Sequence, residues 1–296
     1  MHNDTGGIGV IGLGRMGAEM ARHIAAEQGA GGVLVHSRRR ESAASAEAAG
    51  ARWAATPAEV GAGCAVVLTV LPDLPELEQV LFGPEGLLAG LHTPTVLVIC
   101  STSSPAGVRH LANELHTHTD GLLHCVDAPL SGGREGAAAA TLSIFAGGDG
   151  ADVARATPAL AACGRVVHLG PLGAGQVAKA CNQLIVAATT VALAESAVLA
   201  QRSGLDLAAM FDILGGGYAG SRLLEVKADK LTRFDHSPDS PARLMIKDLQ
   251  FVLDEAEATE TPDEHVRLLQ ELYRQVVDAG MGDLDSTAVQ RYLTER

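Results

Sequence analysis

The chain reads Gly9-Val10-Ile11-Gly12-Leu13-Gly14-Arg15-Met16-Gly17 soon after its first residues, and this stretch carries the pattern G-x-G-x-x-G. An apolar run, Ile8–Ile11, leads into the glycines, and an Ala-rich helical stretch, Arg15–Glu27, follows them. The next apolar run begins at Val33, so the pattern lies between a strand and a helix that returns to a second strand. That context predicts a dinucleotide-binding βαβ unit rather than an ordinary Gly-rich turn.

Each of the three glycines has a physical role in such a turn. Gly12 permits the tight turn after the strand, Gly14 lets the backbone approach a pyrophosphate, and Gly17 lets the helix pack on the sheet. The N-terminus of the helix then faces the negative phosphates. We therefore expect cofactor contacts along the whole turn, from Gly12, Leu13, Gly14, Arg15, Met16 and Gly17.

The alternation of strands and helices continues through the first half of the chain. Apolar runs typical of buried strands are Ile8–Ile11, Val33–Val35, Val66–Val70, Val96–Ile99, Leu122–Val126, Thr141–Ala146 and Val166–Leu169. Helical stretches between them cover Arg15–Glu27, Glu41–Ala49, Leu74–Leu81, Pro105–His116 and Asp152–Cys163. Continuous apolar strands that alternate with helices predict βαβ units and a parallel sheet covered on both faces.

Only helical periodicity follows Gly170, beginning with a long apolar stretch from Gly173 to about Ser203. Later helices are expected at Leu205–Leu214, Leu223–Lys230, Leu244–Thr259, His265–Ala279 and Ser286–Leu293, separated by Gly and Pro clusters. The sequence thus predicts an α/β fold class: an N-terminal Rossmann doubly wound domain at residues 1–170, then an all-α domain at residues 171–296, joined by a long interdomain helix.

Composition and charge exclude several classes of function. The 296 residues are 47% hydrophobic, which suffices for a packed core, and the formal net charge is −13. Nucleic-acid binders usually show a basic face, so the acidic balance argues against a nucleic-acid partner. It does not argue against an anionic small molecule, because one cationic pocket can lie on an acidic protein.

The sequence gives no sign of export or of membrane insertion. The first residues lack a basic segment followed by an apolar one, so no signal peptide is visible. The apolar segment Leu184–Ala200 carries Thr189, Thr190, Glu195 and Ser196, which favours a buried helix over a membrane span. The five cysteines form no C-x-x-C pair, and we interpret them as reduced, buried thiols of a cytoplasmic protein.

The second strand ends in His36-Ser37-Arg38-Arg39-Arg40. A site that prefers NAD usually has an acidic residue here, which accepts hydrogen bonds from the ribose hydroxyls. A guanidinium instead suits the 2′-phosphate of NADP, which it can bind with two hydrogen bonds. The alternative is a solvated basic run on a surface turn. We expect NADP(H) as the preferred cofactor, with NAD(H) left open, and contacts from Ser37, Arg38 and Arg39, of which Arg38 is the first candidate.

Two segments are polar or Gly-rich in ways that packing does not require. Ser131-Gly132-Gly133 follows an apolar strand and presents a hydroxyl and open backbone N–H groups, which can hold a small carboxylate; the alternative is a plain turn. Lys179 and Asn182 stand three residues apart on one face of the long apolar helix. Such a pair is either solvated or directed into a site, and a partly desolvated lysine suits proton transfer near neutrality.

A third segment, Lys247-Asp248-Leu249, begins a helix of the second domain and by itself indicates an exposed ion pair. Together with the others it completes a series of motifs in fixed order: GLGRMG at 12–17, LPD at 71–73, STSSP at 101–105, DAPLSGG at 127–133, TLSIFAGGD at 141–149, GAGQVAKACNQ at 173–183 and KDL at 247–249. On these motifs the sequence resembles the β-hydroxyacid dehydrogenases, the group that contains 3-hydroxyisobutyrate dehydrogenase and tartronate semialdehyde reductase, from residue 8 to about residue 293.

The resemblance implies an NADP-dependent oxidoreductase that interconverts a small β-hydroxyacid and its semialdehyde. Lys179 matches the catalytic lysine, which donates a proton to the carbonyl oxygen as hydride reaches the carbon. Asn182 matches an amide that holds the substrate hydroxyl, and Ser131, Gly132 and Gly133 match the carboxylate cradle. The resemblance also suggests a homodimer or homotetramer, and it implies no metal.

The remaining matches concern the cofactor. Thr102 matches the position that contacts the nicotinamide ribose. Lys247 matches a second lysine that approaches cofactor and substrate. Leu71 and Pro72, in the LPD motif, complete the predicted cofactor contacts. The chain departs from the family pattern at Ile99, Ala140 and Pro238–Ser240, and the last of these puts the identity of the substrate in doubt.

Three alternatives follow from the same motifs. Imine reductases share the architecture but typically carry Asp or Tyr where this chain has Lys179. The 6-phosphogluconate dehydrogenases have a larger helical domain and a His beside the Asn, where this chain has Cys181. A non-catalytic nucleotide-sensing protein would keep the glycines and lose the lysine. Because Lys179, Asn182 and Ser131 are all present, catalysis is favoured.

Overall fold

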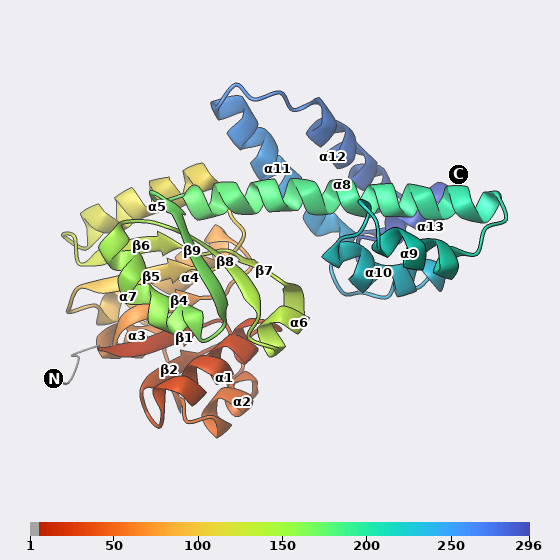
Figure 1. Cartoon of the computed structure of the whole chain (residues 1–296). Coiled ribbons are helices and arrows are strands. Elements are labelled where there is room, and N and C mark those ends of the chain that lie inside the picture. The colour runs from red at the N-terminus through yellow and green to blue at the C-terminus, as the bar shows by residue number, and fades with distance from the viewer. Residues whose placement is uncertain (1–5) are drawn as a thin grey trace. The chain divides into compact units, whose positions relative to one another are not determined.

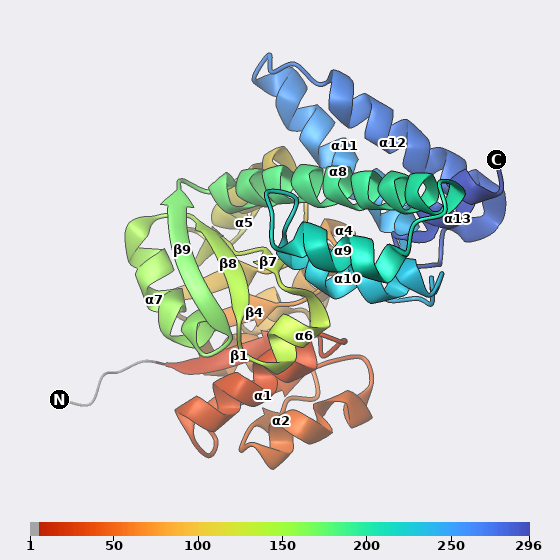
Figure 2. The ribbon, with the colours of Figure 1, turned by 45° about the vertical axis from the view of Figure 1, so that its right-hand side comes forward.

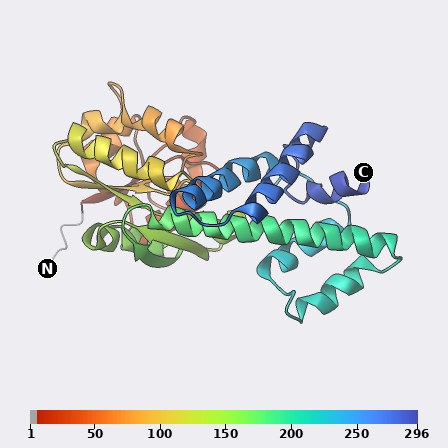
Figure 3. The ribbon, with the colours of Figure 1, turned by 90° about the horizontal axis from the view of Figure 1, so that it is seen from above.

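The computed structural model describes residues 6–296 and divides into two units, Met1–Lys179 and Ala180–Arg296. The first is a Rossmann-type α/β domain and the second is built of helices, as predicted. One helix, α8 (Ala174–Arg202), continues from the first unit into the second without a break (Figures 1 and 3). The predicted boundary at residue 170 precedes α8, whose first turns belong to the first unit.

The first unit is organised around one sheet in the order β3-β2-β1-β4-β5-β6-β8-β7, with β9 paired to β8. The strands from β3 to β6 pair in parallel, in the usual order of a dinucleotide-binding fold. The strands are β1 (Gly7–Ile11), β2 (Val33–His36), β3 (Arg52–Trp53), β4 (Cys64–Thr69), β5 (Thr95–Ile99), β6 (Leu123–Asp127), β7 (Leu130–Ser131), β8 (Leu142–Gly147) and β9 (Gly164–Gly170).

Helices cover both faces of this sheet because its central strands are apolar on both sides. On β4, Val66 and Leu68 pack into one core while Val67, between them, packs into the other. The first core is closed by α1 (Gly17–Gln28), α2 (Ala44–Ala48), α6 (Gly133–Ala138) and α7 (Gly150–Ala161), and the second by α3 (Pro57–Gly63), α4 (Leu74–Leu81) and α5 (Pro105–His118).

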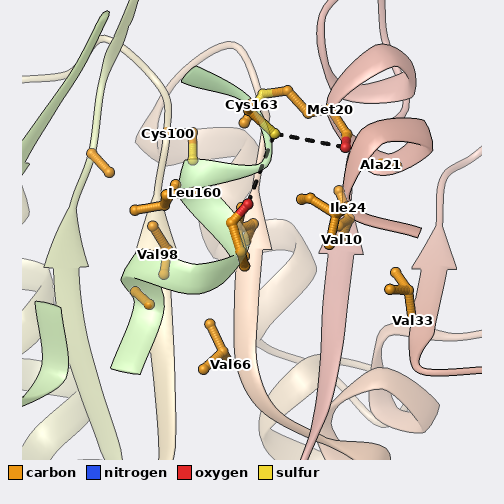
Figure 4. Close-up of a cluster of buried hydrophobic side chains, with 14 of the residues drawn as sticks. Val10, Met20, Ala21, Ile24, Val33, Val66, Val98, Cys100, Leu160 and Cys163 are labelled. Atoms are coloured by element: carbon orange, nitrogen blue, oxygen red, sulfur yellow. Dashed lines mark hydrogen bonds between the residues drawn. The ribbon is translucent and has the colours of Figure 1, made fainter. Parts of the chain in front are cut away.

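Figure 4 shows the first core, where α1 and the residues that follow α7 meet over the sheet. Met20 and Ile24 of α1 lie above Val10, and the Cys163 thiol donates long hydrogen bonds to the Met20 and Ala159 carbonyls. All of these side chains are buried. The helix that follows the glycine-rich turn is therefore fixed to the sheet along its length.

The second unit has its own apolar core, formed by α8 and the helices after it. Phe211, Met245, Leu249 and Tyr273 are fully or nearly fully buried in it. The later helices are α9 (Leu207–Gly215), α10 (Arg222–Thr232), α11 (Ala242–Ala258), α12 (Glu264–Val276) and α13 (Ala288–Thr294), and a π-helical turn at Val277–Met281 follows α12.

Several short elements of the structure were not predicted from the sequence. Strands β3 and β7 are two residues long, and helices α3 and α6 lie in stretches that we had assigned to no element. The helix expected at Glu41–Ala49 is a 3₁₀ turn, Arg40–Ala43, that continues into α2. A second 3₁₀ turn, Leu87–Gly90, precedes β5.

Among the described residues, α8 is the one helix long and apolar enough to cross a membrane by length and composition. Half of its most apolar window is buried inside the protein. A core helix of a water-soluble domain passes the same test, so the finding is weak evidence for a membrane span.

Candidate active site

The ends of five neighbouring strands bring the predicted cofactor residues to one edge of the sheet. The register pairs His36 with Ile11, Ile11 with Thr69, Thr69 with Ile99, and Ile99 with Asp127. Each predicted segment starts just beyond these residues, because the strands are parallel and all end at this edge. The glycine turn therefore lies between the loop after β2 and the loop after β4, with the loop after β5 next along.

Close contacts within the protein require glycine at two positions of this turn. At the third position the glycine faces open space. Gly12 has a φ of 98°, and a Cβ there would overlap the Val70 carbonyl oxygen. A Cβ on Gly17 would overlap the Gly12 carbonyl oxygen, so α1 approaches the turn too closely for any side chain. A Cβ on Gly14, in contrast, would meet nothing within 4 Å, so open space lies in front of this glycine.

The start of α1 fits a negatively charged group. Its N-cap residue is Met16, and no side chain caps the helix. The backbone N–H groups of an uncapped first turn attract anions, and the helix dipole adds to the attraction. Leu13 is buried in the core, whereas Arg15 is exposed, so of these two residues only Arg15 directs its side chain away from the interior. The turn therefore fits a dinucleotide pyrophosphate.

The three arginines after β2 have different surroundings. Arg40 makes a bidentate ion pair with Glu47 and lies 4.8 Å from the centre of the Trp53 ring. Arg39 lies 3.9 Å from Glu41, and both side chains are about three-quarters exposed. Arg38 is exposed and has no ion pair within residues 6–296. Arg40 is therefore engaged by the protein itself, whereas Arg38, and Arg39 with its long exposed contact, can reach a ligand.

The loops after β4 and β5 carry the LPD and STSSP motifs. Leu71 is half-buried and lies beside Gly12, Pro72 is exposed, and the Asp73 carboxylate caps α4 by accepting from the Leu74 N–H at 2.8 Å. Thr102 is half-buried between two buried serines. These positions place the predicted residues along the same edge as the glycine turn.

The side chain of Gln176, on α8, holds the loop that contains Thr102. Its Nε2 donates to the Ser101 carbonyl at 2.8 Å, and its Oε1 accepts from the Ser103 N–H at 3.0 Å. Gln176 is only 1% exposed. The amide therefore binds the backbone on both sides of Thr102, an arrangement that the sequence analysis did not predict.

Asp127, the last residue of β6, holds the start of α8. Its carboxylate accepts from the Gly173 and Gln176 N–H groups, both at 2.7 Å. Burial raises the pKa of Asp127, while these two hydrogen bonds and the charge of Arg109 act in the opposite direction. A Cβ on Gly175 would overlap the carbonyl of Phe145, so the helix can lie this close to the sheet only with glycine there.

Lys179 lies one helical turn after Gln176 and is 8% exposed. The interpretation of Lys179 as a solvated surface lysine is therefore wrong. Since the carboxylate of Asp127 and the amide of Gln176 fix the first turn of α8, they also fix the backbone that carries Lys179. Asn182 follows one turn later on the same helix and is half-buried.

The Ser-Gly-Gly segment forms the end of β7 and the start of α6. Gly132 and Gly133 have φ values of 128° and 62°, which side-chain-bearing residues rarely adopt, and Ser131 is half-buried. Helix α6 lies beside α1 (Figure 2). Arg22 and His23 of α1 both hydrogen-bond to the carbonyl of Ala138, the last residue of α6. The segment is thus a fixed turn that leads into a helix, and its backbone is accessible.

In the second unit, polar side chains link Asn182 to Lys247. Asn182 donates to Gln183 at 2.9 Å, and Gln183 donates to the Asp248 carboxylate at 2.5 Å. The other oxygen of Asp248 lies 3.9 Å from the Lys247 ammonium, which also lies 5.1 Å from the Phe251 ring centre. The sequence predicted an exposed ion pair between Lys247 and Asp248. This is wrong for Asp248, because its side chain is buried.

Four residues of this arrangement were missed from the sequence: Asp127, Gln176, Gln183 and Asp248. All four stand in motifs that we had quoted, and each is a polar residue in an apolar stretch. That combination signals a buried hydrogen-bonded group. The prediction that Cys181 is buried is also wrong, because its side chain is exposed.

Comparison with known families gives two matches that together cover nearly the whole chain. Residues 7–170 match the NAD binding domain of 6-phosphogluconate dehydrogenase. Residues 173–293 match the family described as NAD-binding of NADP-dependent 3-hydroxyisobutyrate dehydrogenase.

Individual relatives are similar over most of their length. A probable 3-hydroxyisobutyrate dehydrogenase-like protein of Arabidopsis thaliana is 37% identical over 82% of this chain and 74% of its own. An NAD-dependent L-serine dehydrogenase of Pseudomonas aeruginosa is 33% identical over 96% of each chain, and the 2-hydroxy-3-oxopropionate reductase of Escherichia coli is 32% identical over 95% of each. The crystal structure of 3-hydroxyisobutyrate dehydrogenase from Salmonella typhimurium matches with a TM-score of 0.86 and 27% identity, over 96% of this chain and 99% of the other.

Proposed function

Because this chain belongs to the β-hydroxyacid dehydrogenase family of NAD(P)-dependent oxidoreductases, we propose that it interconverts a small β-hydroxyacid and the matching semialdehyde, with NADP(H) as the preferred cofactor. The observation that carries the proposal is the placement of Lys179: a buried lysine on a helix that Asp127 and Gln176 fix to the edge of the dinucleotide-binding sheet.

The proposed chemistry uses few protein groups. A nicotinamide cofactor held at the glycine turn would supply the hydride. Lys179 donates a proton to the carbonyl oxygen as negative charge develops there, and in the oxidative direction it accepts that proton. The Asn182 amide, one turn along the same helix face, donates a hydrogen bond to the same oxygen. The backbone N–H groups of the Ser131-Gly132-Gly133 turn and the Ser131 hydroxyl hold the substrate carboxylate.

The NADP preference rests on the contrast among the arginines after β2. Arg40 is already occupied by Glu47 and Trp53, whereas Arg38 is exposed and without an ion pair in the described chain. A guanidinium binds a phosphate dianion through paired charge-assisted hydrogen bonds. The half-buried Ser37 hydroxyl stands beside it in the sequence as a further donor.

The substrate is expected to be small and to carry one carboxylate. The relatives named above include a 2-hydroxy-3-oxopropionate reductase, a 3-hydroxyisobutyrate dehydrogenase-like protein and an L-serine dehydrogenase. These names support tartronate semialdehyde, methylmalonate semialdehyde and L-serine as the first compounds to test. Succinate semialdehyde and glyoxylate extend the panel to a longer and a shorter acid.

The proposal is tested by following NADPH and NADH oxidation with each aldehyde, and NADP⁺ and NAD⁺ reduction with L-serine. We expect rapid turnover of one small acid, faster with the phosphorylated cofactor. Lys179→Ala should lower kcat by about a hundredfold or more, the usual range for a general acid, while NADPH still binds. No turnover with any of these acids, despite tight cofactor binding, would contradict the proposal.

The cofactor preference has its own pair of variants. Arg38→Gln should weaken NADPH binding and leave NADH binding unchanged, because only the 2′-phosphate contact is lost. Arg40→Gln removes the same charge from the same loop and should leave the ratio of the two affinities unchanged. An unchanged ratio in Arg38→Gln would contradict the assignment of Arg38.

A further inference from the structure

We propose that Gln176 is a positioning residue for the reaction, which sets the loop containing Thr102 against the helix that carries Lys179. The inference rests on the function proposed above, and it concerns a residue for which the motifs assign no role. It depends on contacts within the first unit alone.

The side-chain amide of Gln176 bonds to the loop as a main-chain peptide group would, with one donor and one acceptor. Its amide donates to the Ser101 carbonyl at 2.8 Å and accepts from the Ser103 N–H at 3.0 Å, so it pairs with the backbone on either side of Thr102. An amide carries both a donor and an acceptor in one plane, and here both are used. With the side chain 1% exposed, water does not take the place of either partner.

The hydroxyls of the two serines in this loop do not hold its shape. The Oγ atoms of Ser101 and Ser103 are buried, and neither has a hydrogen-bond partner in the part of the chain that the structure describes. Buried hydroxyls without partners are costly, so the serines do not explain the conformation of the loop. The two hydrogen bonds to Gln176 hold the backbone on either side of Thr102.

The other end of the connection is equally fixed. The backbone N–H of Gln176 donates to Asp127 at 2.7 Å, which holds the first turn of α8 against β6. Lys179 follows three residues later on the same helix. Backbone and side chain of Gln176 thus join three elements: β6, the loop after β5, and the turn of α8 that ends at Lys179. A displacement of the loop changes the distance between whatever Thr102 binds and the proton donor.

A purely structural role of Gln176 and a positioning role predict different kinetics for its variants. If the amide only filled space, leucine of similar size would replace it at a cost in stability and not in chemistry. If it positions the loop, its loss moves the cofactor relative to Lys179 in every folded molecule. A misplacement of about 1 Å typically costs about a hundredfold in rate.

The experiment compares Gln176→Leu with a matched control, Gln290→Leu, in the full-length protein. Gln290 is also fully buried, and its Nε2 donates to a main-chain carbonyl, that of Leu231, at 3.1 Å. It lies in the second unit and belongs to none of the described motifs. For each variant, kcat, KM and the primary isotope effect with 4-deuterated NADPH are measured at a temperature where the variant is folded.

We expect Gln176→Leu to lower kcat by about a hundredfold and to raise the isotope effect on kcat, because hydride transfer becomes rate-limiting. Gln290→Leu should change neither. A third variant, Gln176→Glu, gives a pH signature. When protonated, the introduced carboxyl has one donor and one acceptor, as the amide has. Its activity should therefore approach the wild-type value at low pH and fall as the buried carboxyl ionises.

A failure of the positioning role of Gln176 can be distinguished from a failure of the proposed function. Wild-type turnover with an unchanged isotope effect and pH profile in the Gln176 variants would overturn the positioning role. If the wild type turns over none of the acids, NADPH affinity measured by fluorescence still decides. At least tenfold weaker binding in Gln176→Leu than in Gln290→Leu supports the control of the Thr102 loop, and equal affinities overturn it.

Discussion

Lys227 of α10 donates a hydrogen bond of 2.9 Å to Asp285, and both side chains are buried. The same carboxylate accepts from the Ser240 and Thr287 N–H groups at 3.1 Å. Lys230 lies further away, at 3.9 Å. This ion pair holds the loop that precedes α11, the helix on which Lys247 stands.

Removal of Lys227 should be strongly destabilising. In Lys227→Met the Asp285 carboxylate stays buried without its main cationic partner, and such a change typically costs about 3–5 kcal/mol. Urea unfolding followed by circular dichroism measures the loss. The control is Arg222→Met on the same helix, because Arg222 pairs with Glu225 in an exposed position, where ion pairs contribute little. Equal midpoints for the two variants would contradict the assignment.

The same pair predicts how stability depends on pH. Burial alone would raise the pKa of Asp285, but the hydrogen bond and charge of Lys227, with the two N–H groups, outweigh it and hold the pKa below its ordinary value. A carboxylate whose pKa is lowered by folding stabilises the folded state while it is ionised. This stabilisation is present above the unfolded-state pKa of about 4 and is lost as the pH falls through the folded-state pKa. Asp285→Asn should therefore be less stable than wild type at pH 7, and the difference should shrink below about pH 4. A difference that is constant down to pH 2 would exclude this linkage.

The cysteines should differ sharply in reactivity. Burial raises the pKa of Cys64 and of Cys163 to about 12, and it raises that of Cys100 as well, so these thiols stay protonated near neutrality. Cys181 is exposed. Since the thiolate is the reactive form, a disulfide reagent at pH 8 should modify Cys181 first in the native protein and all five thiols after denaturation. Loss of the fast phase in Cys181→Ser checks the assignment.

The parallel sheet could be predicted from the sequence because its strands are buried on both faces and therefore appear as continuous apolar runs. The short strands Arg52–Trp53 and Leu130–Ser131 give no such signal. Helix α3 did have a readable start: Thr56 accepts from the Glu59 N–H, and Glu59 accepts from the Ala55 N–H, a variant of the capping box. We missed it because Gly61 and Gly63 break the helical pattern.

The motifs predicted which residues belong to the candidate site, but not what holds them. Asp127 and Gln176 are 49 residues apart, and Gln176 lies 75 residues after Ser101. Contacts over such separations depend on which strands are neighbours and on how closely α8 approaches the sheet. Periodicity describes one element at a time, so it cannot predict a side chain that joins three of them.

Gly14 and Gly17, in the turn after β1, should respond differently to substitution by alanine. A Cβ on Gly17 would overlap the Gly12 carbonyl oxygen, so Gly17→Ala must displace α1 from the sheet, and overpacking of this kind costs about 1–3 kcal/mol. A Cβ on Gly14 would meet no protein atom within 4 Å, and its backbone is not in the left-handed region. Gly14→Ala should therefore keep the melting temperature of the wild type.

NADPH binding should be weakened more by Gly14→Ala than by Gly17→Ala, which is the reverse of their effects on stability. The space in front of Gly14 is where a pyrophosphate would approach the backbone, so the added methyl group in Gly14→Ala should weaken NADPH binding by at least about tenfold. Thermal unfolding with and without NADPH measures both quantities at once, because a ligand raises the melting temperature only as far as it binds the folded state. Wild-type stabilisation by NADPH in Gly14→Ala would place the cofactor elsewhere. A loss of melting temperature in that variant without ligand would show that the glycine serves the fold instead.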